Sequence, residues 1–429
     1  MKVVHLATQD LGGGGFDAAY RLHRSMLNSG HDSHMIVFRK NSDDSTVVSV
    51  FDQMSFVDWI KYFIVKLRQR FLSRKSKGTS YFYIEPHAYV TAQKMLEMIP
   101  YKPDVIIAHW IAIFASVSTL RDMNRISGSP ILWYFMDMAP MTGGCHYMLG
   151  CDGYTKQCGN CPQLSVGKDD DLSRLQWERK KSIIQDLNIV PVLASSWQKE
   201  KLDRSSIFKD KRSEIIHLGI DVDIFCPRAV SQARSILELP LGKKIIFFGA
   251  QYIDEKRKGI QYLLDALKIL YEVLDDNKAL RDEILIVTAG REQSIETLEI
   301  YFDHQHVGFL NGDELLASAY QAADIFVCPS MEDAGPMMVN ESVLCGTPVV
   351  SFDMGVSRDV VRTNETGYLA KLGSADDMAS GLLKMLELDT VDYDLVRKNC
   401  REYGLKLFHP NVQVNAFEHL CSKLISNDV

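Results

Sequence analysis

The chain has 429 residues, of which 46% are hydrophobic and 24% are charged, and its formal net charge is −7. This length supports two or three domains with cores of normal size, and the ordinary content of glycine and proline excludes a collagen-like or disordered chain. The acidic balance excludes a chain that binds nucleic acid over its whole surface, so we expect no nucleic-acid partner.

The N-terminal segment MKVVHLATQD lacks the charged start and the small-residue cleavage site of a secretory signal, and it is typical of a β-strand. No uninterrupted apolar segment approaches the roughly 20 residues that a membrane-spanning helix needs. We therefore expect a cytoplasmic protein.

Short apolar segments alternate with helical patterns along most of the chain. Strands are expected at 3–7, 35–38, 105–109, 131–135, 190–195, 245–249, 284–289, 325–328 and 349–352. Apolar residues spaced three and four apart predict helices that include 18–28, 260–274 and 314–322. This alternation predicts an α/β protein with parallel sheets and helices on both faces.

The pattern of strand, glycine-containing turn and helix occurs at the N-terminus and again near residues 243–260. Between the two, residues 213–228 have the glycine and proline content of a linker. We therefore predict two doubly wound domains, 1–212 and 213–405.

Residues 59–77 depart from the acidic balance of the chain. Seven basic residues and no acidic one occur between residues 61 and 77, with large apolar side chains among them. Such a helix can lie on an anionic membrane surface, which would make the protein peripheral on the inner face of the membrane. It can equally be an ordinary amphipathic helix whose basic side faces solvent.

Four cysteines lie close together in a segment with loop composition at about 140–165. They are Cys145, Cys151, Cys158 and Cys161. Four thiolates can close a tetrahedral zinc site in a reducing compartment, and we expect a structural zinc ion here. Two disulfides or four free thiols are the alternatives.

The segment that follows the strand expected at 325–328 contains a loop and then a helix that begins near Met337 and ends at Gly346. Ligands of open α/β sheets bind outside the carboxyl ends of the strands, against helix N-termini. The backbone N–H groups of Gly335, Met337 and Met338 are therefore candidates for binding a phosphate.

Two carboxylates of the same segment, Asp333 and Glu341, are eight residues apart. Carboxylates repel phosphate but accept hydrogen bonds from hydroxyl groups. The combination predicts a ligand with a sugar, a ribose and phosphate between them. Alternatively, Asp333 only caps the helix.

Residues 330–353 resemble the donor-site signature of the retaining glycosyltransferases of family four, with Asp-x7-Glu in place of the usual Glu-x7-Glu. The resemblance implies the GT-B fold, in which two Rossmann-like domains face a cleft. It implies that Glu341 binds the ribose of a nucleotide-sugar and Asp333 the transferred sugar. It also implies that the first domain binds the acceptor and the second the donor, and that residues 406–429 form a helix returning to the first domain.

A second resemblance involves Arg257 and Lys258, which precede Gly259 as in a subgroup of this family. The resemblance implies that both cations bind the donor diphosphate, and Lys258 is a catalytic candidate together with Asp333. Ala250 stands where the family usually has arginine.

The glycine-rich turn at residues 12–15 is similar to the family loop that reaches donor phosphate and acceptor. It implies donor contacts for Gly14 and Gly15 and an acceptor contact for Phe16.

The cysteine-rich segment is similar to an insert in a subgroup of the family that acts in colanic-acid-like surface polysaccharide biosynthesis. That subgroup has His-Asp-Met where this chain has Met136 before Asp137. Asp137 and His146 are the remaining acceptor candidates here, and His109 is a further catalytic candidate. Each histidine has a structural role as its alternative.

The resemblance implies a retaining hexosyltransferase without a catalytic metal. The donor is a nucleotide-diphosphate sugar, of the UDP or GDP type, and the acceptor is a glycan or lipid-linked glycan. A GT-B epimerase, a sugar-phosphate synthase and a nucleotide-sugar-binding protein without turnover are the alternatives.

Overall fold

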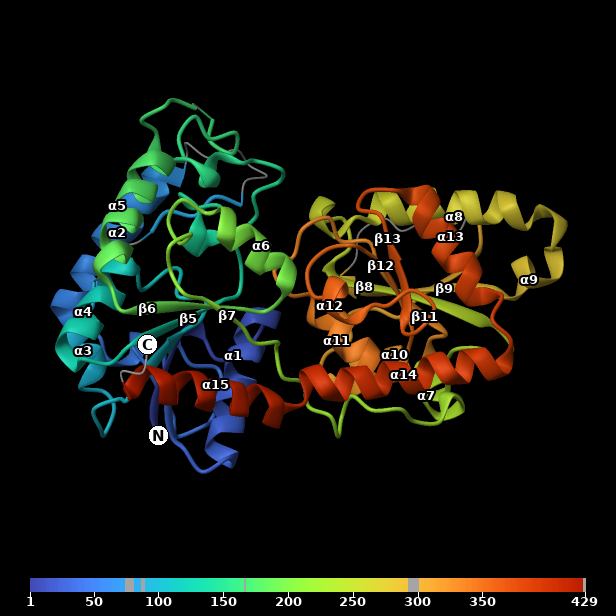
Figure 1. The fold of residues 1–429 in the computed structure, drawn as a ribbon, viewed down its shortest axis with the longest axis horizontal. Helices are drawn as coiled ribbons and strands as arrows, with labels where there is room; N and C mark the ends of the chain where they lie inside the picture. Colours follow the sequence, from blue (N-terminus) through green and yellow to red (C-terminus); the bar gives the residue numbers. More distant parts are fainter. Residues whose placement is uncertain (74–80, 86–88, 166, 292–300, 427–429) are drawn as a thin grey trace. The chain divides into compact units, whose positions relative to one another are not determined.

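The structure is a computed structural model that describes residues 1–73, 81–85, 89–165, 167–291 and 301–426. Contacts divide the chain into two units. The first comprises Met1–Gly219 with Gln413–Val429, and the second comprises Ile220–Val412. Each unit contains one parallel sheet with helices on both faces (Figure 1).

The sheet of the first unit has the strand order β3-β2-β1-β4-β5-β6-β7, and all neighbouring strands are parallel. Its strands are β1 (Lys2–Gln9), β2 (Asp32–Arg39), β3 (Val47–Ser49), β4 (Val105–Ala108), β5 (Ile131–Phe135), β6 (Ile189–Leu193) and β7 (Glu214–Ile215). Its helices are α1 (Gly14–Asn28), α2 (Phe56–Ser73), α3 (Ala92–Leu96), α4 (Val117–Ser127), α5 (Leu172–Asp186), α6 (Ser196–Arg204) and α15 (Pro410–Ile425).

The C-terminal helix α15 packs on the sheet of the first unit. Gln413 Nε2 donates to the Tyr134 hydroxyl at 3.3 Å, and the Phe417 ring contacts the Tyr134 ring with centroids 5.4 Å apart. Farther along the helix, Glu418 Oε1 lies 2.7 Å from His31 Nε2. The end of the chain is thus part of the unit that its first residues build.

The sheet of the second unit has the strand order β10-β9-β8-β11-β12-β13, again parallel throughout. Its strands are β8 (Lys244–Tyr252), β9 (Ile284–Arg291), β10 (Asp303–His306), β11 (Ile325–Cys328), β12 (Val349–Phe352) and β13 (Gly367–Ala370). Its helices are α7 (Val230–Ile236), α8 (Ile260–Val273), α9 (Lys278–Glu283), α10 (Asp313–Ala322), α11 (Met337–Leu344), α12 (Ser357–Val360), α13 (Ala375–Leu386) and α14 (Thr390–Phe408).

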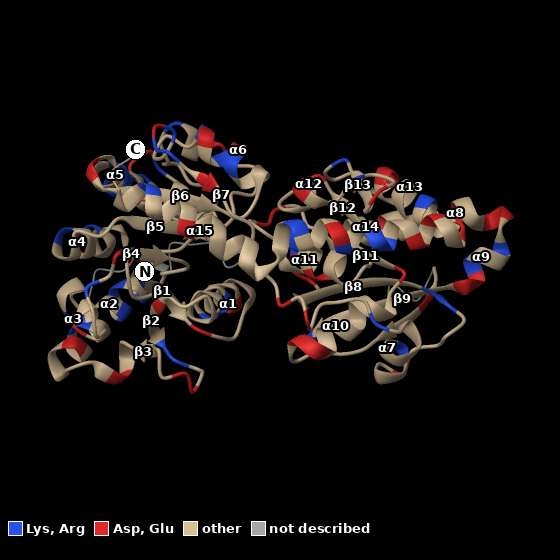
Figure 2. Ribbon diagram, turned by 60° about the horizontal axis from the view of Figure 1, so that its bottom comes forward, with Lys and Arg blue, Asp and Glu red and all other residues tan. Residues whose placement is uncertain are grey.

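Alternation along the strands divides the interior of the second unit into two apolar clusters, one on each face of the sheet. Phe247 and Phe326 point into the cluster that α10 and α11 cover, whereas Ile246 and Val327 point into the cluster that α8 and α13 cover. Figure 2 shows the result: the charged residues lie mainly on helices and loops, and the strands are largely uncharged.

These observations confirm the predicted fold class, two Rossmann-like units with parallel sheets. The strand order reverses between β1 and β4 in the first unit and between β8 and β11 in the second. Loops at the carboxyl ends of such strand pairs separate and leave room for a ligand. The glycine-rich turn follows β1 and the Asp333 loop follows β11, so both predicted sites lie at such positions.

The expected strands and helices are present, with differences of a few residues at their ends. The strand expected at 190–195 is β6, Ile189–Leu193, and the helix expected at 18–28 begins earlier, at Gly14. The segment interpreted as a linker contains the short strand β7. The basic segment forms α2 up to Ser73, and the remainder of that prediction, residues 74–77, lies outside the described residues.

Candidate functional site

The second unit brings three predicted site residues together at the carboxyl ends of β8 and β11. Asp333 Oδ2 accepts hydrogen bonds from Arg257 Nη1 and from Lys258 Nζ, each at 2.8 Å. The cations belong to a short 3-10 turn, Lys256–Lys258, after β8, and Asp333 lies on the loop after β11. One carboxylate therefore holds two cations at the edge of the sheet.

The electrostatics of this cluster fix its charge state. Burial alone would raise the pKa of the Asp333 carboxyl, but Lys258 and Arg257 outweigh that effect and hold the pKa well below its usual range. Arg257 also pairs with Glu255 at 3.0 Å, and its side chain is only 7% exposed. The Asp333 carboxyl is therefore ionised at neutral pH.

The turn that holds the cations is locked against the loop after β11 by close backbone contact. The Met331 N–H donates to the Arg257 carbonyl at 2.9 Å, and Arg257 Nη1 donates to the Glu332 carbonyl at 3.1 Å. Gly259 has a φ of +76°, and a Cβ there would lie 1.9 Å from the Pro329 carbonyl oxygen. Glycine after Lys258 is therefore a steric requirement of this approach.

The same loop leads into α11, which begins at Met337 as predicted. Pro336 precedes it, and no side chain of the described residues caps this N-terminus. Gly335, Met337 and Met338 are partly exposed. Helix N-termini carry partial positive charge and present N–H groups, so this end of α11 and the two cations suit a diphosphate.

Glu341 lies within α11, and its side chain is buried at 2% exposure. Its Oε2 accepts a hydrogen bond from the Tyr320 hydroxyl of α10 at 3.0 Å. Burial, followed by the charge of Glu341, raises the pKa of Tyr320 well above its usual value. The contacts seen for the described residues do not join Glu341 to Asp333, so the ribose role of Glu341 stays a prediction.

In the first unit, α1 starts inside the glycine-rich turn, and Gly14 and Gly15 form its first turn. Phe16 follows them and makes an edge-to-face contact with the Trp110 ring, with centroids 5.3 Å apart. Trp110 follows β4 with only His109 between them, and it was not among the predicted site residues.

Trp110 links Phe16 to the two other predicted acceptor residues. Its indole N–H donates to Asp137 Oδ2 at 2.6 Å, and His146 Nδ1 makes a short hydrogen bond to the same oxygen. Asp137 Oδ1 accepts from the Ala139 N–H at 2.8 Å, which fixes the carboxylate. The structure thus joins the predicted residues Phe16, Asp137 and His146 through one tryptophan.

His109 is buried deeper than these residues. Its Nε2 lies 3.0 Å from His5 Nδ1, and the two rings are stacked. Burial, with a smaller effect of His23, lowers the pKa of His109 to about 3, so the ring is neutral at physiological pH. Its Nδ1 has no hydrogen-bond partner among the described residues.

A small cavity of about 40 Å³ adjoins these groups and is lined in part by His109, Trp110, Asp137 and His146. Lys180, also in its lining, is 2% exposed and donates to the carbonyls of Ala139 at 2.6 Å and Thr142 at 3.0 Å. Lys180 was not predicted as a site residue, because a lysine in the middle of an amphipathic helix is ordinarily solvated.

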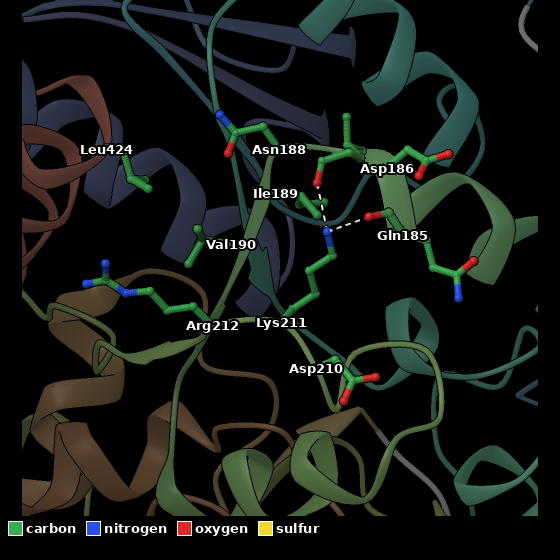
Figure 3. A pocket seen from close by; sticks show the side chains of 10 residues that line it. Gln185, Asp186, Asn188, Ile189, Val190, Asp210, Lys211, Arg212 and Leu424 are labelled. Atoms are coloured by element: carbon green, nitrogen blue, oxygen red, sulfur yellow. Dashed lines mark hydrogen bonds between the residues drawn. The ribbon is translucent and has the colours of Figure 1, made fainter. Parts of the chain in front are cut away.

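A larger open pocket, about 490 Å³, lies elsewhere in the first unit (Figure 3). It is lined by residues 185–190 and 210–212 and by Leu424, and Lys211 Nζ donates to the carbonyls of Gln185 and Leu187. It lies where β6 begins, at the amino end of the strands, opposite to the end that carries the predicted site residues.

The structure does not support the zinc prediction. All four clustered cysteines are free thiols, and the described residues contain no group of three or more His, Cys, Asp or Glu side chains that could hold a metal ion. Instead, Cys158 Sγ accepts from the Gly143 N–H at 3.2 Å, and a hydrogen bond with Cys145 lowers the pKa of Cys161 to about 7. Packing of Cys145 and Cys161 with Leu164 gives the insert a small apolar cluster of its own.

Residues 230–407 match the family model described as glycosyl transferases group 1. The phosphatidyl-myo-inositol mannosyltransferase of Mycobacterium leprae is 33% identical over 204 residues, which are 46% of this chain and 49% of the relative. The D-inositol 3-phosphate glycosyltransferase of Corynebacterium aurimucosum is 31% identical over 185 residues, 41% of this chain and 43% of the relative. The chain thus spans about half the length of the curated relatives it matches.

Among solved structures, sucrose-phosphate synthase from Thermosynechococcus elongatus has a TM-score of 0.65 at 18% identity and covers 100% of both chains. HepE from Anabaena, in complex with UDP and glucose, has a TM-score of 0.61 at 13% identity and covers 98% of this chain and 100% of its own. These likenesses identify the fold as GT-B.

Proposed function

We propose that this protein, whose residues 230–407 match the group 1 glycosyl transferases, is a retaining glycosyltransferase. It would move a hexose from a nucleotide-diphosphate sugar to a hydroxyl group of a glycan or lipid-linked glycan in surface polysaccharide biosynthesis. The single observation that carries the proposal is the cluster of Arg257, Lys258 and Asp333 beside the N-terminus of α11, within the matched segment.

The reaction needs positive charge where the leaving group gains negative charge. When the bond between the sugar and the diphosphate breaks, the departing oxygen becomes anionic, and preorganised cations and N–H groups stabilise it. Lys258 and Arg257 supply the cations, and Gly335, Met337 and Met338 would supply N–H groups. We propose that these groups stabilise the leaving diphosphate and that no catalytic metal takes part.

Asp333 has two roles in this proposal. Its carboxylate orients Lys258 and Arg257, and it would accept a hydrogen bond from a hydroxyl of the transferred sugar. In a retaining reaction without a covalent intermediate, the acceptor hydroxyl attacks the face that the diphosphate leaves. The acceptor proton then passes to the departing phosphate oxygen while the new glycosidic bond forms.

For the acceptor we propose the cluster of Phe16, Trp110, Asp137 and His146 in the first unit. Aromatic faces pack against the apolar faces of sugar rings, and a carboxylate accepts hydrogen bonds from hydroxyl groups. In the glycine-rich turn, Gly14 and Gly15 immediately precede Phe16. The proposed contacts to the donor and to the acceptor would therefore come from neighbouring residues. The surface polysaccharide role rests on the resemblance of the cysteine-rich insert alone.

A sugar-phosphate synthase or epimerase is the second candidate, favoured by the likeness in fold to sucrose-phosphate synthase. Such an enzyme would use the same donor site with a different second substrate. A nucleotide-sugar-binding protein without turnover is the third, favoured by Ala250 and Met136 at positions where related enzymes carry arginine and histidine.

Incubation of the full chain with a panel of nucleotide-sugars separates these candidates. GDP-mannose and UDP-glucose are the first probes, and free nucleoside diphosphate is measured with glycan acceptors, with sugar phosphates and with neither. Release that depends on a glycan supports the proposal, and release that depends on a sugar phosphate supports the second candidate. Binding without release under all three conditions would contradict catalysis.

A further inference from the structure

The helix α2, Phe56–Ser73, exposes an unusual apolar surface on the first unit. Its large exposed side chains have relative exposures of 46–80%, and they recur three and four residues apart. They are Phe56, Val57, Ile60, Phe63, Ile64, Leu67 and Phe71. This spacing places them on one stripe of the helix, which we call the α2 stripe. An exposed apolar surface of this kind is typical of an interaction site.

The opposite side of α2 packs against the first unit. The helix is therefore held in place with the α2 stripe exposed. The Tyr62 ring contacts Tyr89 and Phe38, and Gln69 Nε2 donates to the Ile84 carbonyl at 3.1 Å. Asp58, the only acidic residue in the helix, is 7% exposed and forms an ion pair with Lys94. The exposed surface of α2 therefore carries no negative side chain.

Basic residues border the α2 stripe on both sides. At about 100° per residue, Lys61 and Arg68 lie along one edge, and Lys66 and Arg70 lie along the other. The chain as a whole has a formal net charge of −7, so this concentration of positive charge is local. An apolar stripe between two basic edges is complementary to an anionic lipid surface, where the apolar side chains enter the acyl region and the cations stay among the headgroups.

We propose that α2 docks the protein on an anionic membrane, with the α2 stripe buried in the interface and the helix parallel to the bilayer. A helix of 18 residues is about 27 Å long and offers enough length for such contact. None of the helices in the described part of the chain combines the length and apolar character needed to cross a bilayer. The geometry therefore favours a helix that lies on the membrane.

A second copy of this chain is the competing occupant, and the charges disfavour it. Two copies that pair through the α2 stripe would bring the basic edges of one helix against the basic edges of the other. An anionic lipid surface neutralises the same charges. The proposal concerns the location of the protein and does not rest on the proposed transferase activity.

The test is flotation of the purified full chain with vesicles of phosphatidylglycerol and phosphatidylcholine in equal amounts, and with vesicles of phosphatidylcholine alone. We expect binding to the anionic vesicles that weakens as the salt concentration rises. The apolar variant combines Phe63→Ser with Leu67→Ser and should reduce the partition coefficient at least tenfold. The charge variant combines Lys61→Gln with Arg68→Gln and should reduce it about fivefold for each cation removed.

The matched control combines Val391→Ser with Leu395→Ser on α14, where both side chains are exposed, at 77% and 54%. This control should bind as the natural chain does, and circular dichroism should show that all variants are folded. Failure of the natural chain to bind anionic vesicles would overturn the proposal. Equal binding by the apolar variant would do the same. A dimer in solution that the apolar variant converts to a monomer would assign the α2 stripe to a second copy and also overturn it.

Discussion

Lys258 and Asp333 are 75 residues apart in the sequence, yet Lys258 Nζ lies 2.8 Å from Asp333 Oδ2. The contact exists because β8 and β11 are neighbours in the sheet, so the loops that follow them meet at one edge. It places a cation beside the N-terminus of α11, which is the position that we propose for the donor diphosphate. The first two predictions concern this site.

Replacing Lys258 by methionine should reduce kcat/KM for a nucleotide-sugar by about 100-fold or more, because the leaving diphosphate loses a preorganised cation. Steady-state kinetics of nucleoside diphosphate release measures this effect. Lys256→Met is the matched control: Lys256 is exposed in the same turn and should be dispensable. Equal losses in the two variants would show that only the general charge of the turn matters.

Replacing Glu341 by glutamine tests whether this carboxylate binds ribose or only supports Tyr320. A ribose role predicts donor affinity at least about tenfold weaker, because a hydrogen bond to a charged group contributes about 1.5–3 kcal/mol. Titration calorimetry with a nucleoside diphosphate gives the affinity. Tyr320→Phe removes the hydroxyl that Glu341 accepts from and should affect affinity less. Unchanged donor affinity in Glu341→Gln would refute the assignment.

Replacing Trp110 by phenylalanine keeps an aromatic ring against Phe16 but removes the N–H that donates to Asp137. We expect the KM for the acceptor substrate to rise about tenfold while donor affinity stays unchanged. The reason is that the indole hydrogen bond orients the Asp137 carboxylate, which would bind that substrate. Initial rates at varied acceptor concentration measure the change. Trp177→Phe removes a comparable indole hydrogen bond, to Ser206, and should leave the acceptor KM unaltered. Identical kinetics for Trp110→Phe and the natural chain would argue against this acceptor site.

The buried histidines predict that acid destabilises the first unit. Burial lowers the pKa of His23 from 6.5 to about 4, so the folded protein keeps this ring neutral while the unfolded chain protonates it. The free energy of unfolding therefore falls as pH decreases from 6.5 toward 4, by about 1.4 kcal/mol per pH unit for His23 alone. Above pH 6.5 this contribution is constant.

All five tryptophans lie in the first unit, so urea unfolding followed by tryptophan fluorescence at pH 7 and pH 5 reports on that unit. The free energy of unfolding of His23→Gln should depend less on pH than that of the natural chain, by about 1.4 kcal/mol per pH unit below pH 6.5. His419→Gln, at an exposed position, is the control and should show the full sensitivity. If the loss of stability between pH 7 and pH 5 is the same in His23→Gln, His23 is not its source.

Part of the site was accessible from sequence because the relevant signals are local. The Asp333 loop, the start of α11 at Met337 and the pair Arg257 and Lys258 each lie within a few residues of a strand end. Trp110 was not accessible in this way. A tryptophan after a buried strand is equally expected in a core, and only the fold places it between Phe16 and Asp137.

The cysteine-rich insert and α2 are two further cases in which the sequence did not determine where the side chains point. Close spacing of four cysteines favoured zinc, but spacing does not fix where the sulfur atoms point, and the structure shows thiols held by backbone N–H groups and by each other. For α2, the composition allowed two interpretations. Either the basic side faces solvent in an ordinary amphipathic helix, or the apolar side lies on a membrane. The structure shows that the apolar side is the exposed one, with Phe56 80% accessible.

The alternation of strands and helices in the sequence by itself determined the class of fold, because the spacing of apolar residues along the chain distinguishes buried strands from amphipathic helices. The order of the strands, and hence which loops meet, was decided only by tertiary structure. Parallel pairing joins segments separated by many residues, and no local pattern specifies the partner of a strand. The chemistry of Lys258 with Asp333, and of Trp110 with Asp137, depends on that pairing.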